Sequence, residues 1–300
     1  MAYDNTKPAD NDTWDIAAGL IRDNWDALEA IFGVDLAMDP MLSQSITNEG
    51  AFVTKDPWHD IRAYGALVDG VTDDSSAVQD AMDAAAGGGT VFFPPGTTAL
   101  GSVGWTGLIL TTTTKVTLRG DPRSSILKVL YAPSQSVTGA SSFKQVFRLN
   151  TWTDALITGL TVDMNAQSST GAFGLDSCTR TTVRDCYIYG GDDNESNGIT
   201  SLDGTNNKYI DNHINGGGTG IYLGVVNSGD AENNALVQGN HCIDNTSDAI
   251  SGTMVNCSIV NNYCEGATGS GIELTSGTDV SKDTTINGNI CVGCNYGISS

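Results

Sequence analysis

The sequence predicts an all-β protein, a right-handed single-stranded parallel β-helix, and the first observation behind this prediction is a repeat. After residue 155, six segments share one pattern: apolar, any residue, polar or Gly, usually Asn, any residue, apolar. They are 157–162, 183–188, 209–214, 237–242, 259–264 and 286–291, and their starts lie 26, 26, 28, 22 and 27 residues apart. Repeats of about 20–30 residues are typical of solenoid proteins.

The second observation is a short string, a small residue followed by Ile, that falls between these copies. It occurs at Gly198 and Ile199, Gly220 and Ile221, Ala249 and Ile250, Gly271 and Ile272, and Gly297 and Ile298. The units are short, rich in β-branched residues and broken by Gly, Asn, Ser and Asp, which excludes a helical repeat. Each unit is therefore a coil of short strands, and equivalent strands stack in parallel at ~4.8 Å per coil.

Stacked coils place the same position of every repeat in one column. The fourth position reads Leu160, Cys186, Asn212, Asn240, Asn262, Asn289, and the sixth reads Val162, Ile188, Ile214, Cys242, Cys264, Cys291. We expect each fourth-position Asn to occupy a tight turn, where Asn tolerates left-handed backbone angles. Its amide should hydrogen-bond to the turns of the neighbouring coils, and the sixth column should be an internal stack.

The elements before the repeats begin with a predicted helical segment at 1–33. Asp12 can cap a helix that stops at Gly33, and its apolar positions are Trp14, Ala18, Ile21, Trp25, Leu28 and Phe32. Their spacing is that of a heptad seam. The helix either packs on its own chain or self-associates. Two tryptophans on the seam favour an assembly of more than two helices.

Residues 34–58 are predicted to be a linker, because they contain Pro and Gly and little periodicity. A second helix is predicted over 73–86, with Asp73 or Asp74 as its cap and glycines at 87–89 as its stop. An open end of a β-helix exposes strand edges and core. We therefore expect this helix to cover the end.

Two stretches around this helix resemble a known family. They are HDIRAYGALVDGVTDD at 59–74 and GGTVFFPPG at 88–96. Both are similar to the opening segment of the pectate lyase superfamily, the rhamnogalacturonase/epimerase-like domain of many polysaccharide-processing β-helices. The sequence departs from the family at Val68, where Gly is usual, and at Thr98, where Tyr is usual.

The resemblance implies a pectate lyase-like β-helix domain over 59–300. Its opening motif and capping helix would occupy 59–100, and its coils would occupy 101–300 and continue beyond the chain end. The motif is specific for the fold but says almost nothing about which reaction, if any, the protein catalyses. We interpret its acids Asp69, Asp73 and Asp74 as turn and cap residues rather than as site residues.

The first 33 residues are similar to the virion-attachment segments of bacteriophage tail fibres and tailspikes. Those proteins carry this β-helix, form homotrimers, and bind or cleave host surface glycans. The resemblance implies a location in the virion tail, attachment to a phage baseplate or tail through the N-terminus, and a polysaccharide partner on the bacterial surface. It fits the polar start of the chain, which has no signal-peptide pattern.

Charge limits the other partners. The chain has 35 acidic against 14 basic residues, a net charge of −21. Nucleic acid and anionic membrane surfaces select basic patches, so neither is expected as a partner. No apolar run is long enough for membrane insertion. The negative charge has two possible roles. It either keeps a secreted or virion protein soluble, or it supplies carboxylates that act on sugars or bind Ca²⁺.

The seven cysteines and three histidines give no metal pattern. Cys242, Cys264 and Cys291 share one column, so buried free thiols are expected. Cys291 and Cys294 form a C-x-x-C without a second ligand pair, so no zinc site is predicted. The histidines at 59, 213 and 241 show no cluster, and turn packing is the expected role of the last two.

The Ile string defines a candidate groove. If its isoleucines point inward, the residues after them point outward, and these are Thr200, Tyr222, Ser251, Glu273 and Ser299. Asp248 precedes the same strand one coil below Glu273. This pair is the predicted catalytic pair, with carboxyls expected within the about 5–9.5 Å used by glycosidases. Tyr222, Thr200, Ser251, Asp192 and Asp193 are the predicted substrate-binding residues. For each acid taken singly, a solvated turn is the competing interpretation.

The acids of polygalacturonases are not found at the matching positions, since Gly218-Thr219-Gly220 stands where that family has Gly-His-Gly. From 151 to 300 the only cations are Arg180, Arg184, Lys208 and Lys282. A lyase needs a cationic base or Ca²⁺, whereas a hydrolase needs two carboxylates. Hydrolysis without a cofactor is therefore favoured, unless Asp192, Asp193 and Glu195 recruit Ca²⁺.

Three functions remain open on the sequence. The first is a phage tailspike or tail fibre that depolymerises a surface polysaccharide. The second is a cellular carbohydrate-active enzyme of the same superfamily, and the third is a non-catalytic glycan-binding adhesin. The fold alone does not separate them, because function resides in the groove.

Overall fold

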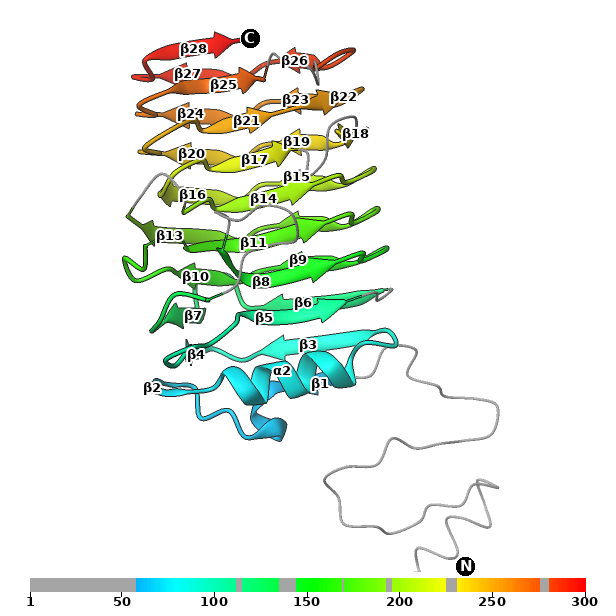
Figure 1. Ribbon diagram of the computed structural model, residues 1–300, viewed down its shortest axis with the longest axis vertical. Coiled ribbons are helices and arrows are strands. Elements are labelled where there is room, and N and C mark those ends of the chain that lie inside the picture. The colour runs from blue at the N-terminus through cyan, green and yellow to red at the C-terminus, as the bar shows by residue number, and fades with distance from the viewer. Residues whose placement is uncertain are drawn as a thin grey trace, which may run out of the picture. The chain divides into compact units, whose positions relative to one another are not determined.

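The computed structural model describes residues 58–111, 115–134, 144–168, 170–192, 196–224, 231–275 and 281–300. The helix predicted within 1–33 and the linker, apart from Trp58, lie outside the described residues. Short strands stack in parallel, coil upon coil, and confirm the all-β parallel β-helix (Figure 1). Among the described residues, no helix is long and apolar enough to cross a bilayer.

Three parallel sheets form the walls of the stack. Sheet A consists of β1 (Trp58–Asp60), β3 (Gly89–Phe93), β6 (Val116–Gly120), β9 (Leu156–Thr158), β12 (Thr182–Arg184), β15 (Lys208–Ile210), β19 (Leu236–Gln238), β23 (Ser258–Val260) and β26 (Thr285–Asn287). Sheet B consists of β2 (Asp69–Asp73), β4 (Gly96–Leu100), β7 (Ser125–Val129), β10 (Thr161–Asp163), β13 (Tyr187–Gly191), β16 (His213–Gly216), β20 (His241–Ile243), β24 (Tyr263–Glu265) and β27 (Ile290–Val292).

Sheet C consists of β5 (Leu108–Thr111), β8 (Lys144–Asn150), β11 (Thr170–Asp176), β14 (Ile199–Leu202), β17 (Ile221–Gly224), β21 (Ile250–Gly252), β25 (Ser270–Leu274) and β28 (Tyr296–Ser299). A short pair, β18 (Glu232–Asn233) and β22 (Met254–Val255), lies between sheets C and A along the chain. The chain runs A, B, C in each regular coil, so every wall is built from residues about one repeat apart.

Helix α2 (Ser75–Ala84) covers the N-terminal end of the stack, as predicted (Figure 1). Its side chains Ala77, Val78, Ala81 and Met82 are buried. The acids before it hold backbone N–H groups of the turn, as predicted, but Asp74, at the N-cap position, makes no side-chain hydrogen bond to the helix. The Asp74 carboxylate accepts the N–H groups of Leu67 and Val68, and the Asp73 carboxylate accepts that of Ser75.

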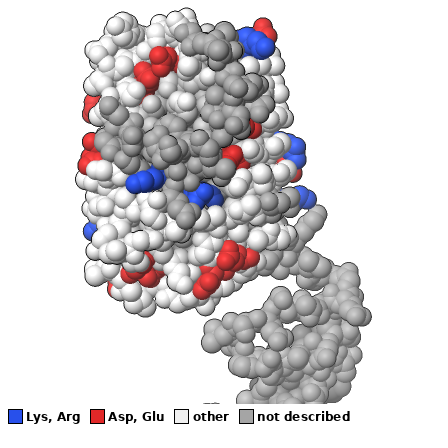
Figure 2. All heavy atoms as spheres, viewed as in Figure 1, with Lys and Arg blue, Asp and Glu red and all other residues white. Residues whose placement is uncertain are grey.

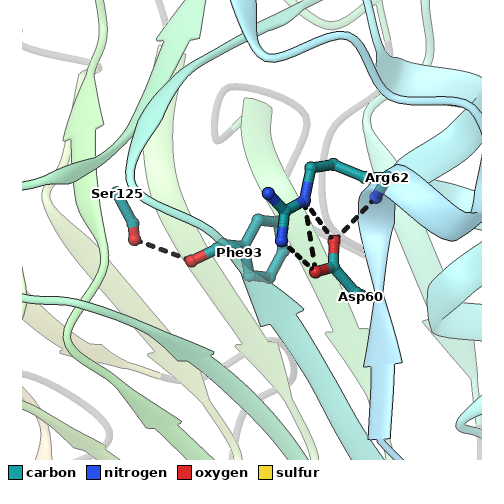
Figure 3. Close-up of polar contacts among 4 residues, drawn as sticks. All are labelled: Asp60, Arg62, Phe93 and Ser125. Atoms are coloured by element: carbon teal, nitrogen blue, oxygen red, sulfur yellow. Dashed lines mark hydrogen bonds and ion pairs between the residues drawn. The ribbon is translucent and has the colours of Figure 1, made fainter.

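Figure 3 shows two polar contacts near the N-terminal end of the stack. The 3₁₀ helix η1 (Ile61–Tyr64) begins after Asp60, whose carboxylate accepts hydrogen bonds from the backbone and guanidinium of Arg62. Ser125 of β7 donates its hydroxyl to the carbonyl of Phe93 in β3 at 2.7 Å. The second contact ties one coil to the next.

Val68, the departure from the family noted above, has a left-handed backbone with φ 56°. A β-branched residue is strained in that region, whereas Gly is not. The conformation explains why Gly is usual at this position.

Both predicted internal columns are confirmed. The sixth-position residues Val162, Ile188, Ile214, Cys242, Cys264 and Cys291 pair one above the other in sheet B. The isoleucines of sheet C do the same and continue a column that begins at Leu108, Phe147 and Phe173. All seven cysteines are free, and five of them are buried.

The glycine before three of these isoleucines, at 198, 220 and 271, has a packing reason. A Cβ added to Gly198 would lie 2.7 Å from Cγ2 of Ile214, and one added to Gly220 would lie 3.0 Å from Sγ of Cys242. The sixth-column side chains therefore fill the space that a larger residue would need. The glycines of one repeated pattern therefore pack against the sixth-position side chains of the other.

The left-handed residue of the tight turn is not the fourth-position asparagine, so that expectation is wrong by one position. The left-handed backbone belongs to the third residue of each repeat: Gly159, Asp185, Asp211, Gly239, Asn261 and Gly288, with φ from 53° to 69°. Because the third residue makes the turn, the fourth side chain is buried along the stack, as Asn212, Asn240 and Asn262 are.

The predicted asparagine ladder is confirmed. Asn212, Asn240 and Asn262 each donate from Nδ2 to Oδ1 of the asparagine in the next coil, at 3.0, 3.0 and 2.9 Å. Each Nδ2 also donates to a main-chain carbonyl of the preceding coil, and each Oδ1 of the next asparagine accepts the backbone N–H as well. The polar groups of the amide are thus satisfied inside the coil.

An acid that the sequence analysis did not single out lies inside the stack. Glu232 of β18 has no exposed surface. Its Oε1 accepts hydrogen bonds from Asn207 and Tyr209, and its Oε2 accepts from Ser201 and the backbone of Gly204, at 2.9–3.2 Å. Burial raises the pKa of Glu232 to about 7, and the four donors lower it only in part. A Cβ on Gly204 would overlap this carboxylate, so only Gly leaves room for it.

Candidate polysaccharide groove

The outer row of sheet C has the predicted register. Thr200, Tyr222, Ser251, Glu273 and Ser299 pair in turn along neighbouring strands, one residue per coil. The register follows from the isoleucines, because each points inward and the next residue must point to the other face. On the face seen in Figure 2, the acidic side chains lie in separate clusters rather than in one continuous patch.

The predicted catalytic pair is brought together at this row. Burial raises the pKa of Glu273, the charge of Asp248 raises it further, and a side-chain hydrogen bond between Glu273 and Asp248 adds to both effects. Asp248 is almost fully buried and accepts the backbone N–H of Ser270 at 2.6 Å and the hydroxyl of Ser247 at 3.3 Å. These effects together favour the protonated form of Glu273.

This contact is closer than the separation of about 5–9.5 Å expected for the two carboxyls. The difference has a simple cause. Asp248 hydrogen-bonds upward to Ser270, in the strand that also carries Glu273, so its carboxylate already lies at the level of the next coil. The sequence gives the order of residues along a strand but not this tilt across coils.

Tyr222 forms a platform beside the pair. A Cβ on Gly224, two residues along the same strand, would lie 2.8 Å from Cζ of the Tyr222 ring. The ring therefore lies over the glycine backbone rather than standing away from the sheet. Burial and the charge of Glu273 raise the pKa of the Tyr222 hydroxyl, so the phenol stays neutral. An aromatic face of this kind suits the apolar face of a sugar ring.

Other predicted substrate-binding residues are less accessible. Thr200 has no exposed surface, and its hydroxyl accepts hydrogen bonds from Gln145 at 3.1 Å and Asn197 at 3.4 Å. It therefore braces the groove floor in this structure instead of meeting a ligand. Ser251 keeps 4% of its surface exposed.

The acidic loop predicted beside the groove is described only in part. Asp192 is exposed and accepts a hydrogen bond from Ser168 at 3.4 Å, while Asp193 and Glu195 lie outside the described residues. Among the residues that the structure describes, no three His, Cys, Asp or Glu side chains are placed to hold a metal ion.

Arg148, just before the range 151–300, is a further cation in the same outer row. Arg148 pairs with Gly174, and Gly174 pairs with Thr200. Burial lowers its pKa, and the charge of Asp176 partly opposes that effect. Arg148 lies five coils from Glu273, or ~24 Å, so it is too distant to act as a base there. Extending the Ile column back to Phe147 would have revealed it.

The histidines also differ from the expectation of isolated turn residues. His213 and His241 lie next to each other on the outer face of sheet B, with ring centroids 4.8 Å apart. They occupy the fifth position of the repeat, which the pattern leaves free. Reading that column as a whole would have shown them beside Tyr187 and Tyr263.

Comparisons with known proteins cover different lengths of the chain. Mannuronan C5-epimerase AlgE4 of Azotobacter vinelandii is 30% identical over 154 residues, which is 51% of this chain and 22% of that protein. Plasmin and fibronectin-binding protein A of Streptococcus pneumoniae is 58% identical over 40 residues, 12% of this chain and 6% of that protein. The chain thus spans less than a quarter of the length of either relative.

Solved structures share the fold at low identity. ORF18 of Geobacillus virus E2 aligns with a TM-score of 0.63 and 14% identity, over 96% of this chain and 56% of that one. PfbA, a surface adhesin of Streptococcus pneumoniae, aligns with a TM-score of 0.59 and 21% identity, over 77% and 61% of the two chains. A family model described as rhamnogalacturonase A/epimerase, pectate lyase-like, matches residues 58–273. The chain therefore belongs to the rhamnogalacturonase A/epimerase, pectate lyase-like family.

Proposed function

We propose that the outer face of sheet C binds a polysaccharide and that Asp248 and Glu273 hydrolyse it. The observation that carries this proposal is the contact between the two carboxyls, one of which has a raised pKa. Carboxyl pairs whose environments hold one proton between them supply both an acid and a base. The Tyr222 ring beside them offers a surface on which a sugar can stack.

In the proposed reaction, a water oxygen attacks the anomeric carbon as the glycosidic bond breaks. Glu273 gives its proton to the leaving oxygen, and Asp248 takes a proton from the water. The two carboxyls touch in the free groove, so the bound sugar and water must separate them. Glu273 is the partner that moves, because Asp248 is held by Ser270 and Ser247.

We further propose that the protein is of the phage tailspike or tail-fibre type. Support comes from the virus protein that shares the fold and from the heptad pattern of residues 1–33. In this proposal residues 1–33 attach the protein to the phage tail or baseplate, residues 34–58 act as a linker, and the chain forms a homotrimer. Its partner would be a polysaccharide of the bacterial surface.

Two other functions have an observation in their favour. The similarity in fold to PfbA supports an adhesin that binds glycans without cleaving them. The similarity to mannuronan C5-epimerases supports a cellular enzyme that acts on uronates. Neither requires the Asp248–Glu273 pair to act as a hydrolytic acid and base.

The test is product release from purified capsular and O-antigen polysaccharides and from polymannuronate, with the full-length protein. Reducing ends report cleavage, absorbance reports unsaturated uronates, and proton NMR reports epimerised residues. We expect new reducing ends without unsaturation, and a loss of about 100-fold in rate for Glu273→Gln and for Asp248→Asn. Asp121→Asn, in an exposed turn away from sheet C, is the matched control.

Each other result would replace the proposal with a named alternative. Unsaturated products would mean a lyase, and epimerised residues without cleavage would mean an epimerase. Binding without any product would mean an adhesin. Cleavage that survives both substitutions would show that the pair is not catalytic.

A further inference from the structure

Sheet B carries a row of aromatic rings on its outer face. Tyr187, His213, His241 and Tyr263 pair in register on four successive coils. Their neighbouring ring centroids lie 4.7, 4.8 and 4.6 Å apart. Tyr189 lies beside Tyr187 at 5.3 Å. All of these residues are partly exposed, so the rings form a continuous strip on the surface.

The strip ends in a hollow of about 230 Å³ on the side of Tyr187 and His213. Polar groups converge on this hollow from three turns. Arg123 holds its guanidinium 5.1 Å above the Tyr187 ring, and the other two turns bring Asp185 and Asp211. The hollow is smaller than the usual pocket for a drug-sized ligand, but it combines an aromatic wall with a few polar groups, as ligand sites do.

Cross-strand stacking of rings stabilises a sheet by itself. That role accounts for the spacing of the rings but not for the hollow at the end of the row. Nor does it account for the phenols at the edges of the strip. Tyr263 hydrogen-bonds to Glu265 and Tyr189 to Asp163, so carboxylates fix the direction of both hydroxyls.

Charge indicates which ligand fits. Burial, then the neighbouring His241 and Arg123, lower the pKa of His213, which favours its neutral form. The flanking acids are Asp163, Asp185, Asp211 and Glu265, and the flanking cations are Arg123, Lys128, the strand partner of Asp163, and Arg184, which forms an ion pair with Asp185 at 3.1 Å. The acids outnumber the cations, so this face favours hydroxyl groups, which can donate to the carboxylates, over a polyanionic glycan.

We propose that this aromatic strip and its end hollow bind an uncharged stretch of glycan, at a site separate from the groove on sheet C. The glycan would run along the stack, with sugar rings on the aromatic strip and a terminal ring in the hollow beside Arg123. The coil spacing of ~4.8 Å is of the same order as the length of one sugar ring, so successive coils can meet successive rings.

The test is titration of the full-length protein with the uncharged probes cellohexaose, maltohexaose and mannohexaose, followed by saturation-transfer NMR, with hexagalacturonate as the charged comparison. We expect an uncharged probe to bind, and its affinity to fall about tenfold in the double variant Tyr187→Ala with Tyr263→Ala. Tyr131→Ala, an exposed tyrosine outside the strip, is the control. Arg123→Gln tests the hollow alone, should the double variant fail to fold.

The groove variant Asp248→Asn with Glu273→Gln separates this inference from the proposed function. It should lose cleavage and keep binding of the uncharged probe to sheet B. The inference is overturned if none of the uncharged probes binds, if hexagalacturonate binds the strip more tightly than they do, or if the strip variants bind as the native chain does. None of these results depends on whether the groove cleaves a polysaccharide.

Discussion

Two corners of the coil bury polar groups in different ways. Between sheets A and B, Asn212, Asn240 and Asn262 bond to one another and leave nothing charged inside. Between sheets C and A, Asn207 makes the same contacts with the coil before it, to Thr181 and Cys178. The next residue in its own column is Ala235, so its remaining N–H donates to Glu232 instead.

The difference shows that a column of asparagines can satisfy its own buried hydrogen bonds, whereas a single buried asparagine cannot. A column of identical amides is self-complementary, because each supplies the acceptor that its neighbour needs. A single amide needs a foreign partner, and here that partner is an ionisable acid. The first corner should therefore be indifferent to pH and the second should not.

The largest effect is expected from breaking the ladder in its middle. Asn240→Ala removes the acceptor of two N–H groups of Asn212 and leaves the carbonyl of Tyr209 without its donor. Several buried groups would lose their partners, at a cost of about 4 kcal/mol in the free energy of unfolding. Urea denaturation measures this. Asn287→Ala, exposed on β26, is the control and should change little.

The second prediction concerns pH. The pKa of Glu232 is about 7 in the folded chain, above the ordinary glutamate value of 4.5 that applies to the unfolded chain. A raised folded pKa stabilises the fold at low pH, and this contribution is lost as the pH rises from about 4.5 through about 7. The loss should amount to about 3 kcal/mol. Urea denaturation as a function of pH checks it.

Glu232→Gln is the matched variant for that measurement. The amide has the same size and cannot ionise, so its stability should stay nearly level over the same pH window. It should be less stable than the native chain at acid pH, because its N–H₂ faces donors. A native profile as flat as that of the variant would refute the assignment.

A smaller loss of stability is expected from substituting Gly204, which packs against the carboxylate of Glu232. Gly204→Ala places a methyl group in the space of the Glu232 carboxylate and the Asn207 amide, which should cost about 2 kcal/mol. Gly87→Ala, where an added Cβ meets nothing within 4 Å, is the control. Melting temperatures of the two variants compare them directly, and equal values would contradict the crowding.

The smallest expected effect is an increase in stability. Cys186 occupies the ladder column, and its backbone N–H already donates to Oδ1 of Asn212. Cys186→Asn would extend the ladder by one coil and should add about 1 kcal/mol of stability. Cys257→Asn, at a corner without a ladder, should destabilise the chain. A loss in both variants would show that the column does not accept further amides.

The same contrast explains which features the sequence predicts. The ladder, the internal columns and the outer row of sheet C recur at equivalent positions in several coils, so one pattern determines all of them. Glu232 occurs once, in the coil with the 28-residue spacing, and nothing in the repeat marks it. The contact between Asp248 and Glu273 lies between these cases. Register brings the two residues near, but the tilt of a turn sets their distance.

The asparagine ladder also has a consequence for how such a gene can change. Each amide bonds only to the coil before and the coil after it, so a coil is an interchangeable unit of 22–28 residues. Duplicating or deleting one whole unit keeps every column in step, whereas removing half a unit brings unlike positions together. Recombination between coils can therefore lengthen or shorten the groove while the fold is inherited unchanged.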